Sequence, residues 1–298
     1  MATFGDRLVA AVRAKKTPLC IGIDPAWARL PESIRLRYGD TGYGRARAAE
    51  EFAYRVLDAA NDMVPAVKVQ AAFFEACGGW GWHSLQWVFR KAARLGMLAI
   101  LDAKRGDIAS TADAYAEMAF DTLHADAVTI SPYLGSDTWM PFVDKAVQID
   151  SGVFVLVRTS NPGASELQGV ALADAPGHTL WQRVATAVER VNENRRGQSG
   201  FGPVGAVVAG TYAADLPLAR RAMPSAWLLI PGYGAQGAQA RDLASAFRHD
   251  GLGGLITASR SLTVIQQMPH RTFEDGVRQA IEQAIAELRR EIPVLTRL

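Results

Sequence analysis

The sequence lacks the features of a secreted, membrane-bound or nucleic-acid-binding protein. Only Cys20 and Cys77 are cysteines among 298 residues, too few for a disulfide framework or a cysteine zinc site. No apolar run reaches the roughly eighteen residues of a membrane span, and the amino terminus has no apolar core like that of a signal peptide. The formal net charge of +2 gives no reason to expect nucleic acid or a membrane surface as a partner. We therefore expect a cytoplasmic protein that binds neither.

Motifs for metals and nucleotide cofactors are equally scarce. The five histidines do not show the HExxH spacing of a zinc site, and we expect neither a G-x-G-x-x-G nor a Walker motif for a nucleotide cofactor. Acidic residues at helical spacing, such as Asp113 and Glu117, are more typical of a solvated helix face than of a metal site. We expect no metal and no cofactor.

What the sequence does contain is a regular alternation of strand-like and amphipathic segments. Eight short runs rich in Val, Ile and Leu are separated by segments with helical periodicity, which is typical of parallel βαβ units. The pattern predicts a (β/α)₈ TIM barrel in a single domain over residues 1–298, with a doubly wound open sheet as the alternative. Two long connections, near residues 26–45 and 192–203, are predicted to be insertions. The predicted strands are Leu19–Ile23, Ala66–Val69, Met97–Leu101, Ala127–Ile130, Val153–Val157, Val204–Val208, Ala226–Ile230 and Gly254–Thr257.

The most informative stretch follows the third predicted strand. Asp102 and Lys104 are two residues apart, so they point to the same side of an extended chain, and Asp107 lies in the turn beyond them. In a barrel the carboxyl ends of the strands carry the catalytic groups. Lys68, inside the second strand, needs a carboxylate partner if it is buried, and Asp102 on the neighbouring strand is the natural one. Asp24 follows the first strand. These residues predict a charged site at the barrel mouth.

The later strands end in turns that suit an anionic ligand. Ser160 lies in a polar turn after the fifth strand, and Gln236 lies in the glycine-rich turn Pro231–Gly237 after the seventh. Ser259 and Arg260 follow the eighth strand. Because glycine-rich turns present backbone N–H groups and barrels often bind phosphate between the loops after strands seven and eight, we expect a phosphorylated substrate.

Taken together, these motifs resemble the orotidine 5'-monophosphate decarboxylase family, and within it the bacterial branch with insertions. The resemblance runs from about Leu19 to Ser261. It rests on the string Asp102-x-Lys104-x-x-Asp107 together with Asp24, Lys68 and the polar turns, which follow one another along the chain in the order typical of the family.

The resemblance implies cofactor-free decarboxylation of orotidine 5'-monophosphate (OMP) to uridine 5'-monophosphate (UMP) and CO2 in de novo pyrimidine biosynthesis. It gives Lys104 the role of proton donor to C6 and places Asp102 against the departing carboxylate, with Lys68 and Asp107 completing the catalytic set. It further implies a homodimer with shared sites, because one subunit's Asp107 would enter its neighbour's pocket. The substrate-binding residues that it implies are Asp24 for the ribose, Ile108 and Thr111 from the neighbouring subunit, Ser160 for the pyrimidine, Gln236 for base and phosphate, and Ser259 and Arg260 for the phosphate.

Three other interpretations remain open on the sequence alone. A magnesium-dependent hexulose-phosphate synthase shares the D-x-K-x-x-D string, but that group is expected to carry a glutamate where this chain has Lys68. A Schiff-base aldolase would use Lys68 or Lys104 as a nucleophile, for which a lysine kept charged between carboxylates is poorly suited. A non-catalytic module that binds a nucleotide phosphate is disfavoured because the whole polar array is present.

Overall fold

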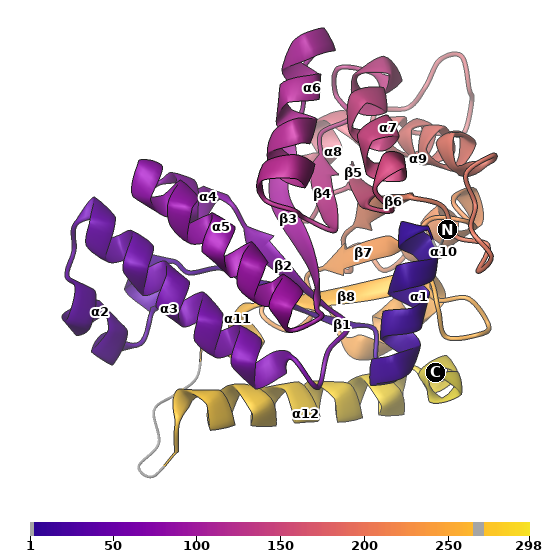
Figure 1. The fold of residues 1–298 in the computed structure, drawn as a ribbon. Helices are drawn as coiled ribbons and strands as arrows, with labels where there is room; N and C mark the ends of the chain where they lie inside the picture. The colour runs from indigo at the N-terminus through magenta and orange to yellow at the C-terminus, as the bar shows by residue number, and fades with distance from the viewer. Residues whose placement is uncertain (1–2, 265–270) are drawn as a thin grey trace.

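In the computed structural model, which describes residues 3–264 and 271–298, eight parallel strands close into a barrel in sequence order (Figure 1). Pairing between β1 and β8 closes the sheet, so the barrel prediction is confirmed and the open-sheet alternative is wrong. The strands are β1 (Leu19–Ile23), β2 (Ala66–Gln70), β3 (Leu98–Arg105), β4 (Ala127–Ile130), β5 (Gly152–Arg158), β6 (Val204–Val208), β7 (Leu228–Pro231) and β8 (Gly254–Ala258).

Helices surround the barrel and cover its outer face (Figure 1). The segment Ala240–Ala246, between β7 and β8, is a 3₁₀ helix rather than an α-helix. The α-helices are α1 (Phe4–Lys15), α2 (Glu32–Tyr38), α3 (Gly42–Ala60), α4 (Ala72–Glu75), α5 (Gly79–Arg94), α6 (Ala109–Glu117), α7 (Met140–Gln148), α8 (Ala164–Leu167), α9 (Leu180–Asn192), α10 (Leu216–Ala222), α11 (Arg260–Thr263) and α12 (Phe273–Glu291). The remaining helical segments are the π-helical η2 (Met118–Thr122) and the 3₁₀ helices η1 (Trp27–Arg29), η3 (Ser136–Trp139), η4 (Ala240–Ala246) and η5 (Pro293–Arg297).

Five of the eight predicted strands differ from the observed ones at their ends, β2, β5 and β8 by a single residue at an end and β3 and β7 by more. β3 continues past Leu101 to Arg105, because an irregularity in its pairing with β4 lets Arg105 pair with Ile130. β7 begins at Leu228 rather than Ala226, since the backbone N–H of Ala226 is engaged in a turn with the carbonyl of Met223.

The strands read as continuous apolar runs because both of their faces are buried. Along β1, Leu19, Ile21 and Ile23 belong to the core between sheet and helices, whereas Cys20 belongs to the core inside the barrel. The same alternation in the other strands gives an outer and an inner apolar layer.

Helix α1 closes the amino-terminal end of the barrel. Its buried residues Phe4, Leu8, Val9 and Val12 pack into the inner core, and the Phe4 ring lies edge-on to Phe154. This apolar plug fills the barrel at the end where the strands begin. The opposite end, where the strands finish, is left for the polar residues.

The two long connections have structure of their own. Residues 26–45 contain η1, α2 and the start of α3. The segment 192–203 is only partly an exposed turn, because Phe201 is fully buried and Asp6 of α1 accepts hydrogen bonds from the backbone N–H groups of Gln198 and Ser199.

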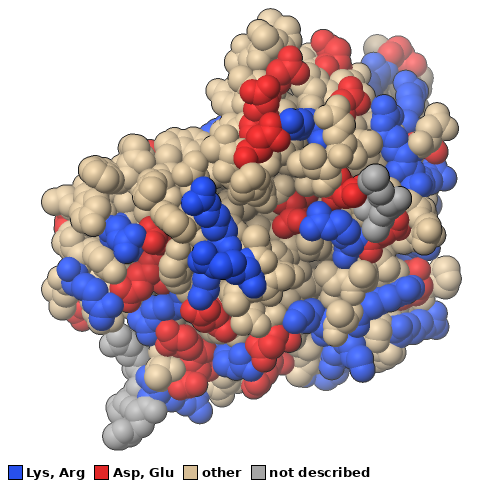
Figure 2. All heavy atoms as spheres, viewed as in Figure 1, with Lys and Arg blue, Asp and Glu red and all other residues tan. Residues whose placement is uncertain are grey.

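Basic and acidic side chains are interspersed over the face shown in Figure 2, so that neither sign covers it as a continuous patch. Among residues 3–264 and 271–298, no helix combines the length and the apolar character that crossing a membrane requires.

Candidate active site

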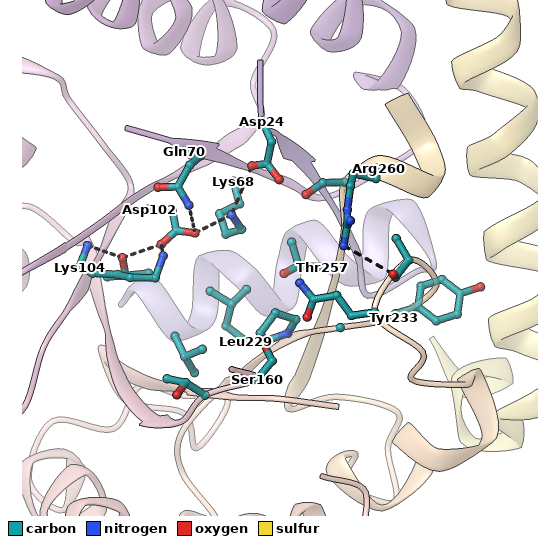
Figure 3. A pocket seen from close by; sticks show the side chains of 18 of the residues that line it. Asp24, Lys68, Gln70, Asp102, Lys104, Ser160, Leu229, Tyr233, Thr257 and Arg260 are labelled. Atoms are coloured by element: carbon teal, nitrogen blue, oxygen red, sulfur yellow. Dashed lines mark hydrogen bonds and ion pairs between the residues drawn. The ribbon is translucent and has the colours of Figure 1, made fainter. Parts of the chain in front are cut away.

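A pocket of about 220 Å³ opens at the carboxyl ends of the strands (Figure 3). Charged side chains from β2 and β3 occupy one side, and the turns after β7 and β8 form the other. The sequence-predicted residues that line it are Asp24, Lys68, Asp102, Lys104, Ser160, Gln236, Ser259 and Arg260. The other lining residues are Gln70, Thr129, Leu156, Thr159, Val207, Leu229, Pro231, Gly232, Tyr233, Ala235 and Thr257.

The carboxylate of Asp102 is the centre of the charged side. Oδ2 accepts hydrogen bonds from Lys68 Nζ at 2.6 Å and from Gln70 Nε2 at 3.1 Å. Oδ1 accepts from Lys104 Nζ at 2.5 Å and from Thr129 Oγ1 at 3.0 Å. Each oxygen therefore has one cationic and one neutral donor, which fixes the orientation of the carboxylate.

Burial and pairing oppose each other in this cluster, and pairing wins. Burial alone would raise the pKa of Asp102, but the ammonium groups of Lys68 and Lys104 hold it well below its ordinary range. Burial alone would lower the pKa of Lys68, but Asp102 and the more distant Asp24 raise it above its ordinary value. Asp102 and Lys68, only 6% and 7% exposed, are thus both charged near neutral pH.

Lys104 differs from Lys68 and Asp102 in exposure and in backbone conformation. About half of its side chain (46%) is exposed to the pocket side, whereas Lys68 is buried. Its φ of 49° lies in the left-handed region, which a residue with a side chain rarely adopts. The regular extended strand that we expected here from the sequence is therefore wrong. The side chains of Asp102 and Lys104 meet because the chain bulges between them, not because a flat strand alternates.

Asp24, at the end of β1, faces the same cluster. Its Oδ1 lies 4.0 Å from Lys68 Nζ. That oxygen is buried, and it has no hydrogen-bond partner in the described part of the chain. A buried carboxylate oxygen without a donor is suited to accept a hydrogen bond from a ligand hydroxyl.

The opposite side of the pocket is built from turns. Gly232, Gly234 and Gly237 all have positive φ values, which is why the turn after β7 is rich in glycine. Arg260, at the start of α11, is exposed, and its Nη2 lies 3.5 Å from the carbonyl oxygen of Ala235 in that turn. The guanidinium and the surrounding backbone N–H groups form a suitable place for a phosphate.

This turn has the spacing G-x-G-x-x-G, so the expectation that this motif is absent is wrong. In dinucleotide-binding proteins that spacing joins the first strand of a βαβ unit to a helix. Here it follows the seventh strand of a barrel and leads into the 3₁₀ helix η4. The spacing therefore lacks the structural context of a dinucleotide site.

Tyr233, to which the sequence assigned no role, anchors the turn from behind. Its hydroxyl donates to Oε2 of Glu287 on α12 at 2.8 Å. Burial and this hydrogen bond raise the pKa of Tyr233 above its ordinary value, so the phenol remains a donor.

Three sequence-predicted residues do not reach the pocket of their own chain. Asp107, Ile108 and Thr111 lie beyond the end of β3, and none of them lines the cavity. Asp107 instead accepts a hydrogen bond from the backbone N–H of Ile108, whose side chain is 59% exposed.

The lining residues that the sequence did not predict include Gln70, Thr129, Tyr233 and Thr257. Gln70 had a usable signal, because it lies two residues after Lys68 and so on the same face of β2. Thr129 and Thr257 sit within apolar strands and gave none. Thr257 Oγ1 is buried and has no hydrogen-bond partner among the described residues. Within residues 3–264 and 271–298, no three His, Cys, Asp or Glu side chains lie close enough together to hold a metal ion.

The model of a known family matches most of the chain. Residues 17–267 match the model of the orotidine 5'-phosphate decarboxylase / HUMPS family. The chain belongs to this family. The family predicted from the sequence is therefore confirmed, and with it the prediction of an enzyme.

Similar proteins share both the length and the fold of this family member. The chain is 38% identical to orotidine 5'-phosphate decarboxylase of Rhodopirellula baltica over 304 residues, covering 97% of this chain and 100% of the relative. It is 41% identical to the protein of that name from Deinococcus radiodurans over 262 residues, or 87% and 89% of the two chains. The solved structure of Leishmania donovani OMP decarboxylase is 34% identical, with a TM-score of 0.78 over 99% of each chain.

Proposed function

We propose that this protein decarboxylates orotidine 5'-monophosphate to UMP and CO2, as a step of de novo pyrimidine biosynthesis and without a cofactor. The observation that carries the proposal is the Asp102 carboxylate held between the ammonium groups of Lys68 and Lys104 in the pocket. Membership of the family and the names of the similar proteins support the same activity.

The proposed reaction requires a cation beside the reacting carbon. When the bond between C6 and the carboxylate breaks, CO2 leaves and its bonding electron pair stays on C6, an sp² carbon with no electron sink in the ring. In our proposal the Lys104 ammonium stabilises this charge and delivers a proton to C6, which gives UMP. Asp102, ionised beside the departing carboxylate, would repel it in the ground state.

The remaining residues are assigned to the parts of the substrate that do not react. We assign Asp24 and Lys68 to the ribose, since a free carboxylate oxygen and an ammonium lie side by side there. Ser160 and Gln236 are assigned to the pyrimidine, and Gln236, Ser259 and Arg260 to the phosphate. Binding of the remote phosphate would supply free energy for ordering the groups around the reacting carbon.

The family also includes sugar-phosphate enzymes, and Lys68 argues against that branch. Its ammonium lies 2.6 Å from Asp102 and 4.0 Å from Asp24, between the two carboxylates that a divalent cation would need. A second cation at this point would be repelled by the first. The same pairing makes Lys68 a poor Schiff-base nucleophile.

We further propose a homodimer in which Asp107, Ile108 and Thr111 complete the pocket of the second subunit. Their position outside their own pocket and the exposure of Ile108 support this arrangement. Mixing the inactive variants Lys104→Ala and Asp107→Ala tests it. Subunit exchange would restore activity, because one site of the mixed dimer contains both wild-type residues, whereas two self-contained sites would remain inactive.

The activity itself is tested by following the ultraviolet absorbance of orotidine 5'-monophosphate with the purified protein, with and without EDTA. We expect turnover that survives EDTA and falls on the order of 10⁴-fold in Lys104→Ala. Lys145→Ala, which removes a lysine paired with Asp121 outside the pocket, is the matched control. An inert wild type would refute the proposal, and activity lost to EDTA would favour the magnesium-dependent branch.

A further inference from the structure

The pairing between β3 and β4 is interrupted where the charged residues lie. Leu101 pairs with Val128, and the next pair along is Arg105 with Ile130. Three residues of β3, Asp102 to Lys104, therefore lie opposite one residue of β4, Thr129. Such a bulge re-aims side chains, but it also removes regular ladder hydrogen bonds from the residues within it.

Thr129 provides hydrogen bonds that the interrupted ladder does not. Its Oγ1 accepts a hydrogen bond from the backbone N–H of Lys104 at 2.9 Å and donates to Oδ1 of Asp102 at 3.0 Å. Because an ionised carboxylate only accepts and a backbone N–H only donates, the direction of both bonds is fixed. A single hydroxyl thus links the backbone of one charged residue to the side chain of the other.

The residue whose backbone Thr129 holds is the one in an unfavourable conformation. Lys104 has a φ of 49°, and residues other than glycine keep such angles only when surrounding contacts impose them. Its Nζ reaches Oδ1 of Asp102, the same oxygen to which Thr129 donates. Thr129 is 1% exposed, so water cannot readily take the place of its hydroxyl.

We propose that Thr129 is a positioning residue of this enzyme: its hydroxyl holds the left-handed backbone of Lys104 and the carboxylate of Asp102 in one arrangement before substrate binds. The proposal rests on the proposed function, in which Lys104 must stand at the reacting carbon. Catalytic groups misplaced by about 1 Å can cost on the order of 10²-fold in rate, so a hydroxyl that fixes two of them affects turnover more than binding.

The test compares Thr129→Val, which keeps the shape but removes the hydroxyl, with Thr129→Ser, which keeps the hydroxyl. We expect kcat to fall about 10²-fold in the valine variant, with the affinity for UMP little changed, and to recover most of its value in the serine variant. Thr17→Val is the matched control. Thr17 is also 1% exposed and accepts a backbone hydrogen bond from Leu19, but it lies outside the pocket and should leave kcat unchanged.

A kcat for Thr129→Val within about twofold of the wild type would overturn the proposal. If the valine variant does not fold, Thr129→Ala and Thr129→Ser replace it as a pair, because both lose the methyl group and only serine keeps the hydroxyl. Equal kcat values for alanine and serine would then contradict the proposed role.

A crystal structure of Thr129→Val separates this proposal from the proposed function. We expect the Lys104 backbone to leave the left-handed region or Lys104 Nζ to move away from Asp102, whether or not the wild type acts on orotidine 5'-monophosphate. An unchanged Lys104 would overturn the positioning role. An inactive wild type with a displaced Lys104 in the variant would overturn only the proposed function.

Discussion

The two sides of the pocket are built in different ways. On the β2–β4 side, Lys68, Asp102 and Thr129 are buried in strands and hydrogen-bonded to one another directly or through Asp102. On the β7–β8 side, Gln236 is exposed on the turn after β7 and Arg260 is exposed at the start of α11. On the first side the charged side chains are paired with one another, whereas on the second the exposed guanidinium of Arg260 hydrogen-bonds only a backbone carbonyl among the described residues.

This difference follows from what each side has to do in the proposed reaction. Charges that stabilise a transition state are effective when they are already oriented, because reorganising them during the reaction costs free energy. Groups that bind a phosphate need only reach it, and their binding free energy can be used to order the site. We therefore expect substitutions on the strand side to affect both stability and turnover, and those on the turn side to affect mainly binding.

The largest effect is expected for Asp102→Ala. Removing this carboxylate leaves Lys68 buried with only Asp24, at 4.0 Å, to compensate it. Because removal of one partner leaves the other charge buried and unpaired, the free energy of unfolding should fall by about 3 kcal/mol. Turnover should also be lost. Urea unfolding monitored by circular dichroism measures the first effect.

Asp58→Ala is the control for this substitution, because Asp58 also pairs with a lysine but is about half exposed. That exposed pair should contribute less than about 1 kcal/mol. Equal losses in Asp58→Ala and Asp102→Ala would contradict the view that burial makes the strand side important for stability.

A smaller and different effect is expected for Arg260→Ala on the turn side. Because its guanidinium is exposed, the free energy of unfolding should change by no more than about 0.5 kcal/mol. Loss of a charge-assisted bond to phosphate should raise KM by roughly 10²-fold. Steady-state kinetics and urea unfolding of the same preparation separate the two quantities.

Arg183→Ala, which removes an exposed arginine paired with Asp174 outside the pocket, should change neither KM nor stability. If Arg260→Ala lowered kcat at saturating substrate as much as it raised KM, the division of roles between the two sides would be wrong.

The smallest effect concerns pH. The pKa of Asp102 is lower in the folded protein than the ordinary aspartate value of about 3.9. Its contribution to stability is therefore fully present above that value and is lost as pH falls below it, since the unfolded chain then binds the additional proton. Between pH 5 and pH 3 the wild type should lose about 1 kcal/mol more than Asp102→Asn.

Unfolding measured at pH 5 and pH 3 in both proteins tests this difference. Arg260→Ala should show the same pH dependence as the wild type, because the turn side contributes no buried carboxylate to this comparison. Parallel pH profiles for the wild type and Asp102→Asn would mean that the Asp102 pairing does not stabilise the fold.

The sequence by itself determined the barrel fold and most of the charged and polar residues at the carboxyl ends of its strands. Apolar runs alternating with amphipathic segments leave few architectures that bury every strand on both faces, so the closed barrel could be predicted. Lys68 could be paired with Asp102 because consecutive strands of a barrel are neighbours, and Arg260 could be placed at the barrel mouth because it follows the last strand.

Tertiary structure alone decided how the charged residues meet. The bulge opposite Thr129, the left-handed backbone of Lys104 and the hydrogen bond from Gln70 to Asp102 depend on the register between neighbouring strands. Register is fixed by side-chain packing across the whole sheet, so it cannot be predicted from the spacing of residues along one strand. For the same reason, Thr129 gave no signal in the sequence: its hydroxyl acquires two partners only when β3 bulges against β4.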